Sequence, residues 1–234
     1  MSIRAVLMDF NGVIINDERI QMKLYQDIFK EEGFEMTEEE YLACTGMDDT
    51  RFIKHHFNRV EKELSDEKIY ELRMKKSEMW RKVIDKEMPL CDGVENFIRK
   101  CSNRFAMGIV SMANRDDILY LLEKTGLRSC FTKVISTEDV TEHKPSPQCY
   151  LACFRYLDQR RTAAGHFPLL HRECVVIEDA PQGIQAGKNA GMQTLGVTNT
   201  FDAEILRNAG ADAVTKTLAD WMPDSLNRVF SKTV

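Results

Sequence analysis

The sequence has 234 residues, of which 43% are hydrophobic and 29% are charged, and its formal net charge is −5. This length suits one large domain or two small ones, and the composition is typical of a globular protein. The acidic balance argues against a nucleic-acid-binding surface, and no apolar run is long enough to span a membrane. A strand-like run follows Met1 too closely to leave room for a signal peptide, so we expect a cytoplasmic protein.

Seven cysteines are scattered along the chain, and none belongs to a Cys-x-x-Cys pair. An odd count without such spacing indicates reduced thiols, as in the cytosol. Cys149 and Cys153 lie one turn apart on a predicted helix, but two thiols without a histidine make a poor zinc site. We therefore expect both side chains in a helix core.

The first predicted element is an apolar strand near the start of the chain, which ends at Asp9, Asn11 and Gly12. In a parallel sheet, ligands bind at the carboxyl ends of the strands. Asp9 therefore stands where a nucleophile or a metal ligand would be useful. The alternative is that Asp9 merely caps a turn after a buried strand.

Residues 16–88 carry helical signals only. Helical spacing of apolar residues and capping signals predict helices at residues 18–31, from Thr37, after residues 47–50 and from Ser65 up to Pro89. Because nothing in this stretch resembles a strand, we predict a compact, all-helical domain.

From Pro89 onward the pattern alternates between strands and helices. The predicted strands cover residues 105–111, 134–137, 173–177, 192–197 and 213–215. The predicted helices cover residues 92–102, 116–124, 147–157, 183–190 and 203–208. This alternation predicts a parallel sheet covered by helices on both faces. We expect a doubly wound α/β core domain of residues 1–15 and 89–234, interrupted by the helical domain of residues 16–88.

Residues 158–172 fit neither pattern and contain Gly165 and Pro168, so we expect a long surface loop there. Its adjacent Arg160 and Arg161 are candidates for binding phosphate, but a solvated loop is the simpler interpretation.

Polar residues follow three further predicted strands. Ser111 precedes a predicted helix start, where a hydroxyl and free backbone N–H groups suit an anion. Lys144 lies in a loop stiffened by two prolines, and it would present its ammonium to a phosphate or to Asp9. The pair Glu178 and Asp179 precedes a glycine turn and suits a hard divalent cation.

Each of these features also has a purely structural explanation. Ser111 could cap the next helix, and Lys144 could be an exposed lysine. Glu178 and Asp179 could be charges at a helix N-terminus. However, all four strand ends lie at the same edge of the predicted sheet. Together with Asp9 they supply a nucleophile, an anion cradle, a cation and metal ligands, which phosphoryl transfer requires.

The four stretches resemble the haloacid dehalogenase superfamily, in particular its β-phosphoglucomutase-like and phosphoglycolate-phosphatase-like members. Family enzymes open with Asp-x-Asp-Gly-Val, and this chain has Asp-Phe-Asn-Gly-Val at residues 9–13. The later family motifs are matched by Ser111, by Lys144-Pro-Ser-Pro147, and by Glu178-Asp179 with Gly183 and Ala190-Gly191-Met192. The resemblance covers nearly the whole chain, and it implies a Rossmann-like core with an inserted helical cap.

The resemblance also implies a mechanism. Asp9 would attack phosphorus and form an aspartyl-phosphate. The implied cofactor is Mg²⁺, held by Asp9, the backbone carbonyl of Asn11 and Asp179, with Glu178 binding directly or through water.

The implied phosphate site consists of Ser111, the backbone of Met112 and Ala113, and Lys144, which would neutralise the transferring group. The implied partner is a small phosphorylated metabolite, without nucleic acid or membrane. We expect a monomer or a weak homodimer.

Position 11 is the main departure from the family pattern. Family phosphatases have a second aspartate there, which acts as general acid and then as general base. The carboxamide of Asn11 cannot exchange a proton at neutral pH, although it can still donate a hydrogen bond. Loss of a general acid–base typically lowers the rate by about 10²–10⁴.

The predicted cap departs from the pattern as well, because Gln21 stands where mutase relatives have a catalytic histidine. Sugar-phosphate mutase activity is therefore disfavoured. A carboxylate of the cap could supply the missing proton relay, although such carboxylates near helix starts are common. The candidates for this relay are Asp17, Asp48 and Asp49. The residues predicted to face a substrate are Asp17, Gln21, Gly46, Asp49 and Arg51.

Two functions remain open at this point. The first is a Mg²⁺-dependent phosphatase-like hydrolase of small phosphate monoesters, with acid–base catalysis weakened by Asn11. The second is a relative that binds a phosphorylated metabolite without efficient turnover.

Overall fold

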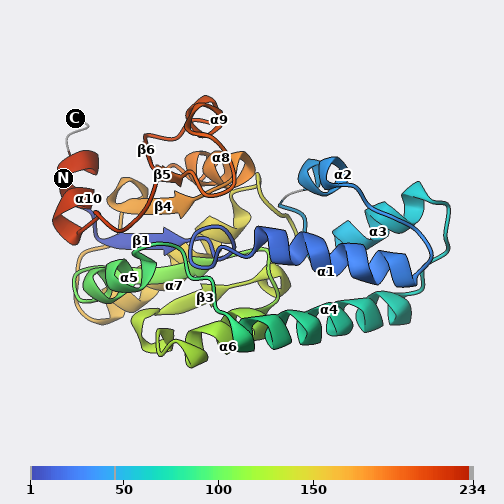
Figure 1. Cartoon of the computed structure of the whole chain (residues 1–234). Coiled ribbons are helices and arrows are strands. Elements are labelled where there is room, and N and C mark those ends of the chain that lie inside the picture. The colour runs from blue at the N-terminus through green and yellow to red at the C-terminus, as the bar shows by residue number, and fades with distance from the viewer. Residues whose placement is uncertain (1, 45, 232–234) are drawn as a thin grey trace. The chain divides into compact units, whose positions relative to one another are not determined.

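The computed structural model describes residues 2–44 and 46–231 (Figure 1). The chain divides into two compact units. The sheet unit comprises Met1–Asn16 and Leu90–Val234, and the helical unit comprises Asp17–Pro89. These boundaries differ by one residue from the predicted domain limits. That the helical unit serves as a cap stays a prediction.

The sheet unit is built on a six-stranded sheet in the order β3-β2-β1-β4-β5-β6, in which all neighbouring strands are parallel. The strands are β1 (Ala5–Met8), β2 (Ala106–Val110), β3 (Lys133–Ile135), β4 (Cys174–Glu178), β5 (Gln193–Val197) and β6 (Ala213–Thr215). The predicted Rossmann-like α/β fold is confirmed.

The strand order changes direction at β1. From β1 the chain adds β2 and β3 on one side, and it then crosses over to place β4, β5 and β6 on the other side. In β1, Met8 pairs with Ile109 of β2 and with Ile177 of β4. In open α/β sheets, the crevice at such a reversal, outside the carboxyl ends of the strands, is where ligands bind.

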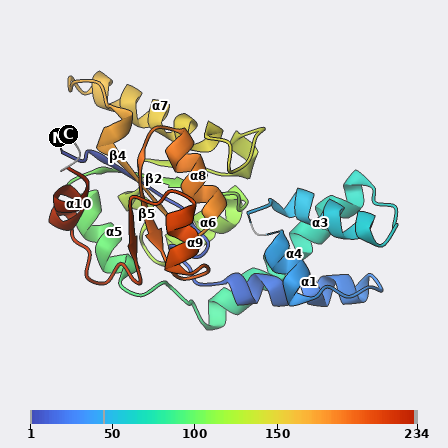
Figure 2. The same ribbon diagram turned by 90° about the horizontal axis from the view of Figure 1, so that it is seen from above.

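Helices cover both faces of the sheet. They are α5 (Val94–Ser102), α6 (Arg115–Lys124), α7 (Gln148–Ala163), α8 (Pro181–Asn189), α9 (Ala203–Asn208) and α10 (Pro223–Phe230). Figure 2 shows α7 and α8 together on one side of the sheet and α5 on the other. Ala5 and Leu7 belong to the core cluster under α7 and α8. Val6 and Met8 are equally buried and face the opposite side, because side chains alternate along a strand.

The structure corrects two predictions about the sheet unit. Helix α7 continues to Ala163, so residues 158–163 are helical and Arg160 and Arg161 lie in its last turn. The apolar pattern stops at Leu157, but glutamine and arginine are good helix formers and extend the helix without burial. Helix α10 was missed, although Pro223 at its first position is a known start signal. The first error concerns the end of a predicted helix, and the second is a helix absent from the prediction.

The helical unit contains α1 (Glu18–Glu31), α2 (Glu38–Ala43), α3 (Asp49–Arg59) and α4 (Asp66–Lys86). The predicted Thr37 capping box is present, since Thr37 accepts from the Glu40 amide and the Glu40 carboxylate accepts from the Thr37 amide. The core of this unit is mainly aromatic, with Phe29 and Phe52 among its buried members. Among the described residues, no helix is both long and apolar enough to cross a membrane.

A histidine is buried inside this aromatic core. The His56 ring lies 4.6 Å from the Phe52 ring and 5.3 Å from the Phe29 ring, measured between centroids. Neither ring nitrogen has a hydrogen-bond partner among the residues that the structure describes. Burial, with a smaller contribution from the neighbouring His55, lowers the pKa of His56 to about 4. The imidazole is therefore neutral and is held there at an energetic cost.

Replacing His56 with phenylalanine is expected to raise the free energy of unfolding by about 1–3 kcal/mol at pH 7, because two unsatisfied buried polar atoms are removed. Between about pH 6.5 and 4, unfolded His56 binds a proton that the folded form does not bind. Acidification through this window therefore lowers the stability of the native protein, and His56→Phe should remove that part of the loss. Urea unfolding across this pH range measures both effects. The exposed His55→Phe should leave the stability at pH 7 unchanged and should reduce the acid-dependent loss only slightly, because His55 is the smaller cause of the lowered His56 pKa.

Candidate functional site

Two carboxylates lie side by side at the ends of β1 and β4. The Asp9 amide donates to the carbonyl of Ile177 at 3.0 Å, which continues the ladder one residue beyond Met8. Asp9 and Glu178 are therefore the next residues along two adjacent parallel strands. Both are buried, Glu178 almost completely at 1% exposed. The topology brings together two acidic residues that are far apart in the sequence.

The Lys144 ammonium lies between these carboxylates. Its Nζ is 2.7 Å from Asp9 Oδ1 and 2.5 Å from Glu178 Oε1, and it also donates to the carbonyl of Val110 at 3.1 Å. The side chain is only 5% exposed, which excludes the alternative of a solvated lysine. Burial alone would lower the pKa of Lys144, but the two carboxylates raise it well above its ordinary value. The ammonium therefore stays charged.

Tyr150 is a member of this cluster that the sequence did not reveal. Its hydroxyl donates to Glu178 Oε1 at 2.6 Å, and the Lys144 Nζ lies 5.3 Å from the centre of its ring. Burial, with the Glu178 charge, raises the pKa of Tyr150 well above its ordinary value, so the phenol remains a donor. A tyrosine in the first turn of a helix has no pattern that sets it apart from a core residue.

Three carboxylates converge on one point. Asp9, Glu178 and Asp179 are all buried, and each offers one oxygen within 4.8 Å of the others. Burial raises the pKa of the Glu178 carboxyl, and the Lys144 ammonium only partly offsets this effect. Three carboxylates and one ammonium leave an excess of negative charge. A hard divalent cation with oxygen ligands fits this donor set and would balance the charge.

Two glycines allow the carboxylates to pack against the backbone. At Gly12, where φ is +70°, an added Cβ would lie 1.8 Å from Asp179 Oδ2. At Gly183, an added Cβ would lie 1.9 Å from Glu178 Cδ. Neither approach is possible with a side chain present. In place of the expected glycine turn after Asp179, Gly183 lies in the first turn of α8 (Pro181–Asn189), where it makes room for the Glu178 carboxylate.

Replacing Gly183 with alanine is expected to displace the Glu178 carboxylate, to weaken Mg²⁺ binding, and to destabilise the protein by about 1–3 kcal/mol. The control Gly187→Ala, on the same helix, forces a Cβ against Thr194 and Val176 instead, away from the carboxylates. It should also destabilise but leave Mg²⁺ affinity unchanged. Calorimetric titration with Mg²⁺ measures the difference. Equal Mg²⁺ affinity in the two variants would show that Glu178 takes no part in metal binding.

The loop around Lys144 is held from both sides. The Gln148 side chain accepts hydrogen bonds from the amides of Thr141 and Glu142, at 2.9 and 2.6 Å. The Asn189 side chain donates to the carbonyl of Pro145 at 3.1 Å, and the Lys144–Pro145 peptide bond is cis. These contacts connect the loop to α7 and α8. They keep the lysine stem directed at the ends of β1 and β4.

Replacing Lys144 with methionine is expected to lower the free energy of unfolding by about 3–5 kcal/mol in metal-free buffer, since Asp9 and Glu178 lose their buried counter-ion. Added Mg²⁺ should recover part of this loss. Urea unfolding with and without Mg²⁺ measures it. The control Lys188→Met breaks a pair with Asp212 in which the lysine is 37% exposed, so about 1 kcal/mol or less is expected. Similar losses in both variants would contradict the assigned role.

The end of β2 provides a second polar group. Ser111 is buried, and its Oγ accepts from the Ala113 amide at 3.1 Å. The cap of helix α6 is Asn114, whose side chain accepts from the Asp117 amide at 2.9 Å. Ser111 therefore does not cap the helix, and that alternative is excluded. Met112 and Ala113 follow it in the same turn, buried and half-buried respectively.

Asn11 begins a tight turn that is tied to a distant segment. The Gly12 amide donates to the carbonyl of Ile15 at 2.7 Å. The side chain of Asn199, which follows β5, donates to the carbonyl of Gly12 at 2.7 Å and to Cys91 Sγ at 3.4 Å. Asn199 thus supports the turn that carries Asn11, and its sequence context offers no sign of this. Asn11 itself is half-buried.

Asp17 and Asp49, two of the acidic residues predicted in the cap, form hydrogen bonds or ion pairs within the helical unit. Asp17 is fully buried and accepts from Trp80 Nε1 at 2.7 Å and from Gln21 Nε2 at 2.8 Å. Asp49 pairs with Lys76 at 2.9 Å. Burial would raise the pKa of Asp49, but Lys76 and its hydrogen bonds hold it below its ordinary value. A carboxylate held ionised in this way is poorly suited to relay a proton.

Asp48 caps α3 by accepting from the amides of Thr50 and Arg51, at 3.0 and 3.2 Å. Arg51 is exposed, and Gly46 and Gln21 are half-buried. That these residues of the helical unit face a substrate stays a prediction.

Residues 6–197 match the family described as haloacid dehalogenase-like hydrolase. The chain belongs to this family. A validoxylamine A 7'-phosphate phosphatase of Streptomyces hygroscopicus subsp. limoneus is 26% identical over 221 residues, which cover 93% of this chain and 95% of that protein. A fructose-1-phosphate phosphatase of Escherichia coli is 26% identical over 196 residues, which cover 82% and 95%.

Another relative of the family is much longer than this chain. The protein SUPPRESSOR OF QUENCHING 1 of Arabidopsis thaliana is 26% identical over 91% of this chain, but the match covers only 19% of that protein. Among solved structures, a family IA hydrolase of Entamoeba histolytica has a TM-score of 0.81 at 24% identity, covering 98% of this chain and 100% of that one. The β-phosphoglucomutase of Clostridium difficile has a TM-score of 0.82 at 19% identity, covering 98% of both chains. These structures support the fold.

Proposed function

We propose that this haloacid dehalogenase-like protein is a Mg²⁺-dependent phosphatase-like hydrolase of small phosphate monoesters. The observation that carries the proposal is the convergence of three buried carboxylates, Asp9, Glu178 and Asp179, at the carboxyl edge of the sheet, where the Lys144 ammonium pairs with Asp9 and Glu178. Two relatives that match this chain over most of their length are named as phosphatases of validoxylamine A 7'-phosphate and of fructose-1-phosphate. They support phosphate esters as the substrate class.

In this proposal Asp9 attacks phosphorus and forms an aspartyl-phosphate while the alcohol leaves. Asp9, the backbone carbonyl of Asn11, Glu178 and Asp179 would hold Mg²⁺, which when bound neutralises charge on the phosphoryl oxygens. Glu178 accepts from both Lys144 and Tyr150, so its carboxylate is fixed before any ligand arrives.

Ser111 and the backbone amides of Met112 and Ala113 would bind the remaining phosphate oxygens. The Ala113 amide donates to Ser111 Oγ at 3.1 Å and would share its hydrogen with the phosphate. Lys144 has three N–H donors, and all three are engaged, by Asp9, Glu178 and the Val110 carbonyl. We therefore assign Lys144 a coulombic role toward the phosphate, together with the positioning of Asp9.

The proposed active site has no acid–base group at position 11 to transfer a proton. Protonation of the leaving alcohol and deprotonation of the attacking water both require an acid–base group, and Asn11 supplies none. The consequence depends on the leaving group. An ester with an acidic leaving group needs no proton in the first step, so Asp9 should be phosphorylated faster than the aspartyl-phosphate is hydrolysed. Such esters should produce an initial burst followed by slow turnover.

A screen of phosphate esters, with and without Mg²⁺, tests the proposal. p-Nitrophenyl phosphate and a set of sugar phosphates are suitable substrates, with free phosphate as the readout. We expect slow, Mg²⁺-dependent release that is fastest for p-nitrophenyl phosphate. Stabilisation against heat by an ester, with no phosphate released over hours, would instead identify a binding protein without useful turnover.

A further inference from the structure

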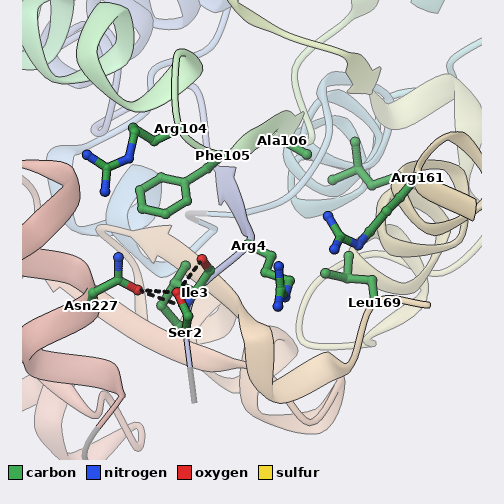
Figure 3. Close-up of a pocket in the computed structure, with 10 residues that line it drawn as sticks. Ser2, Ile3, Arg4, Arg104, Phe105, Ala106, Arg161, Leu169 and Asn227 are labelled. Atoms are coloured by element: carbon green, nitrogen blue, oxygen red, sulfur yellow. Dashed lines mark hydrogen bonds between the residues drawn. The ribbon is translucent and has the colours of Figure 1, made fainter. Parts of the chain in front are cut away.

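A second polar cavity lies at the edge of the sheet opposite to the carboxylate cluster. It has a volume of about 240 Å³ and lies beside Arg4, which precedes β1, and Ala106, which begins β2 (Figure 3). This volume is far above the roughly 15 Å³ that one water molecule requires. We call it the amino-edge cavity, because β1 runs from here toward Asp9 at its other end.

The charge in the amino-edge cavity has one sign. Three arginines line it, Arg4, Arg104 and Arg161, and none of the residues that line it is acidic. They come from three segments that are distant in the sequence. Figure 3 shows the guanidinium groups of Arg4 and Arg161 extending into the same space. Arg4 pairs with Glu173 at 3.0 Å and Arg104 with Asp224 at 3.4 Å. Arg161 therefore brings to the cavity a positive charge that no carboxylate of the described residues balances.

The partners of these arginines leave donors available to a ligand. Arg4 uses Nε toward Glu173 at 3.0 Å. Arg161 uses Nε toward the carbonyl of Phe167 at 2.8 Å, and it has no carboxylate partner in the described part of the chain. In each case the bond that holds the side chain uses one of five N–H donors. The two terminal nitrogens of each guanidinium group, in Arg4 and in Arg161, remain available to a ligand.

The other residues that line the amino-edge cavity are partly apolar and are held in place by packing and hydrogen bonds. Leu157 and Leu169 are buried side chains that line the amino-edge cavity, and Phe105 lines it from the β2 side. Asn227 Oδ1 accepts from the Ile3 amide at 2.8 Å, which fixes the chain next to Arg4. A ligand that fits this site has acidic groups for the arginines and a small carbon skeleton for the leucines.

We propose that the amino-edge cavity binds a small organic anion with at least two negative charges, through Arg4 and Arg161. A guanidinium fork matches a carboxylate or a phosphate with two parallel hydrogen bonds, so the two arginines can take one acidic group each. The site does not depend on the chemistry at Asp9. It lies at the opposite ends of the strands that carry Asp9 and Glu178, so it is a separate binding function.

Calorimetric titration tests the proposal, with citrate as the carboxylate probe and inorganic phosphate as the phosphate probe. The buffer is free of metal and matched in ionic strength with sodium chloride. We expect citrate to bind the wild type, and we expect Arg4→Gln and Arg161→Gln each to weaken binding at least about tenfold. Arg161→Gln is the sharper variant, because it breaks no ion pair of the fold. The control Arg160→Gln removes the same charge from an exposed neighbour and should leave affinity within about twofold.

The titration with phosphate distinguishes binding in the amino-edge cavity from binding near Ser111 at the opposite edge of the sheet. Phosphate binding that persists in Ser111→Ala and is lost in Arg161→Gln would show that the amino-edge cavity accepts phosphate as well as carboxylates. The proposal is overturned if citrate does not bind, or if Arg160→Gln weakens binding as much as Arg161→Gln does. It also fails if phosphate alone binds and Ser111→Ala abolishes that binding.

Discussion

Replacing Asn11 with aspartate is expected to raise the turnover of an alkyl phosphate by about 10²- to 10⁴-fold, which is the usual contribution of a general acid–base. The residue lies in the turn immediately after Asp9, and the Gly12–Ile15 and Asn199–Gly12 hydrogen bonds hold that turn in place. These bonds involve the backbone of Gly12, so the substitution leaves them intact. The new carboxyl would protonate the leaving alcohol and then activate water.

Steady-state release of phosphate from a sugar phosphate, with Mg²⁺ present, measures this gain. The gain should be smaller in the burst phase with p-nitrophenyl phosphate, whose leaving group needs no proton. The control Asn16→Asp makes the same chemical change at an exposed position of the sheet unit and should leave turnover unchanged. A turnover that does not rise in Asn11→Asp would mean that proton transfer is not what limits this protein.

Replacing Asp9 with asparagine is expected to lower turnover by about 10⁴-fold or more, because loss of the nucleophile disables the whole catalytic group. The shape of the side chain is kept, and the carboxamide oxygen can still accept from Lys144. The loss therefore separates the chemistry of Asp9 from its packing. Phosphate release in the presence of Mg²⁺ measures it, and the exposed Asp116→Asn should behave as wild type.

A second readout follows from the weak proton transfer at position 11. In the wild type, p-nitrophenyl phosphate should leave a phosphoryl group on the protein, detectable by intact mass after an acid quench. Asp9→Asn should show no such adduct. An adduct of equal size in Asp9→Asn would place the acceptor on another residue and refute the role of Asp9 as nucleophile.

The fold was largely predictable because its signals are local. Alternation of strands and helices after Pro89 reflects a parallel sheet buried on both faces, and every strand predicted there is present. The extension of α7 was not predicted because burial stops guiding the pattern in its polar last turns beyond Leu157. Helix α10 is a different case, since it buries Leu226 and Phe230 at helical spacing. Capping signals such as Thr37 succeeded because they depend on neighbouring backbone groups alone.

The candidate site was predictable only for residues at strand ends. Ser111 and Lys144 follow predicted strands, and the rule for parallel sheets places them at one edge. Tyr150 and Asn199 carry no such signal, since each reaches its partner through tertiary packing. Asp17 is a further case, because the sequence gives no sign that its carboxylate accepts a hydrogen bond from Trp80 Nε1.

The amino-acid sequence by itself determined the class of fold, the order of its elements and the residue types at the strand ends, because these depend on periodicity and on bonds between near neighbours. Only the tertiary structure decided which charges meet. The contact of Lys144 with Asp9 joins residues 135 apart in the sequence, and the arginines at the opposite edge come from positions 4, 104 and 161. Such contacts depend on strand order and register, which local patterns do not encode.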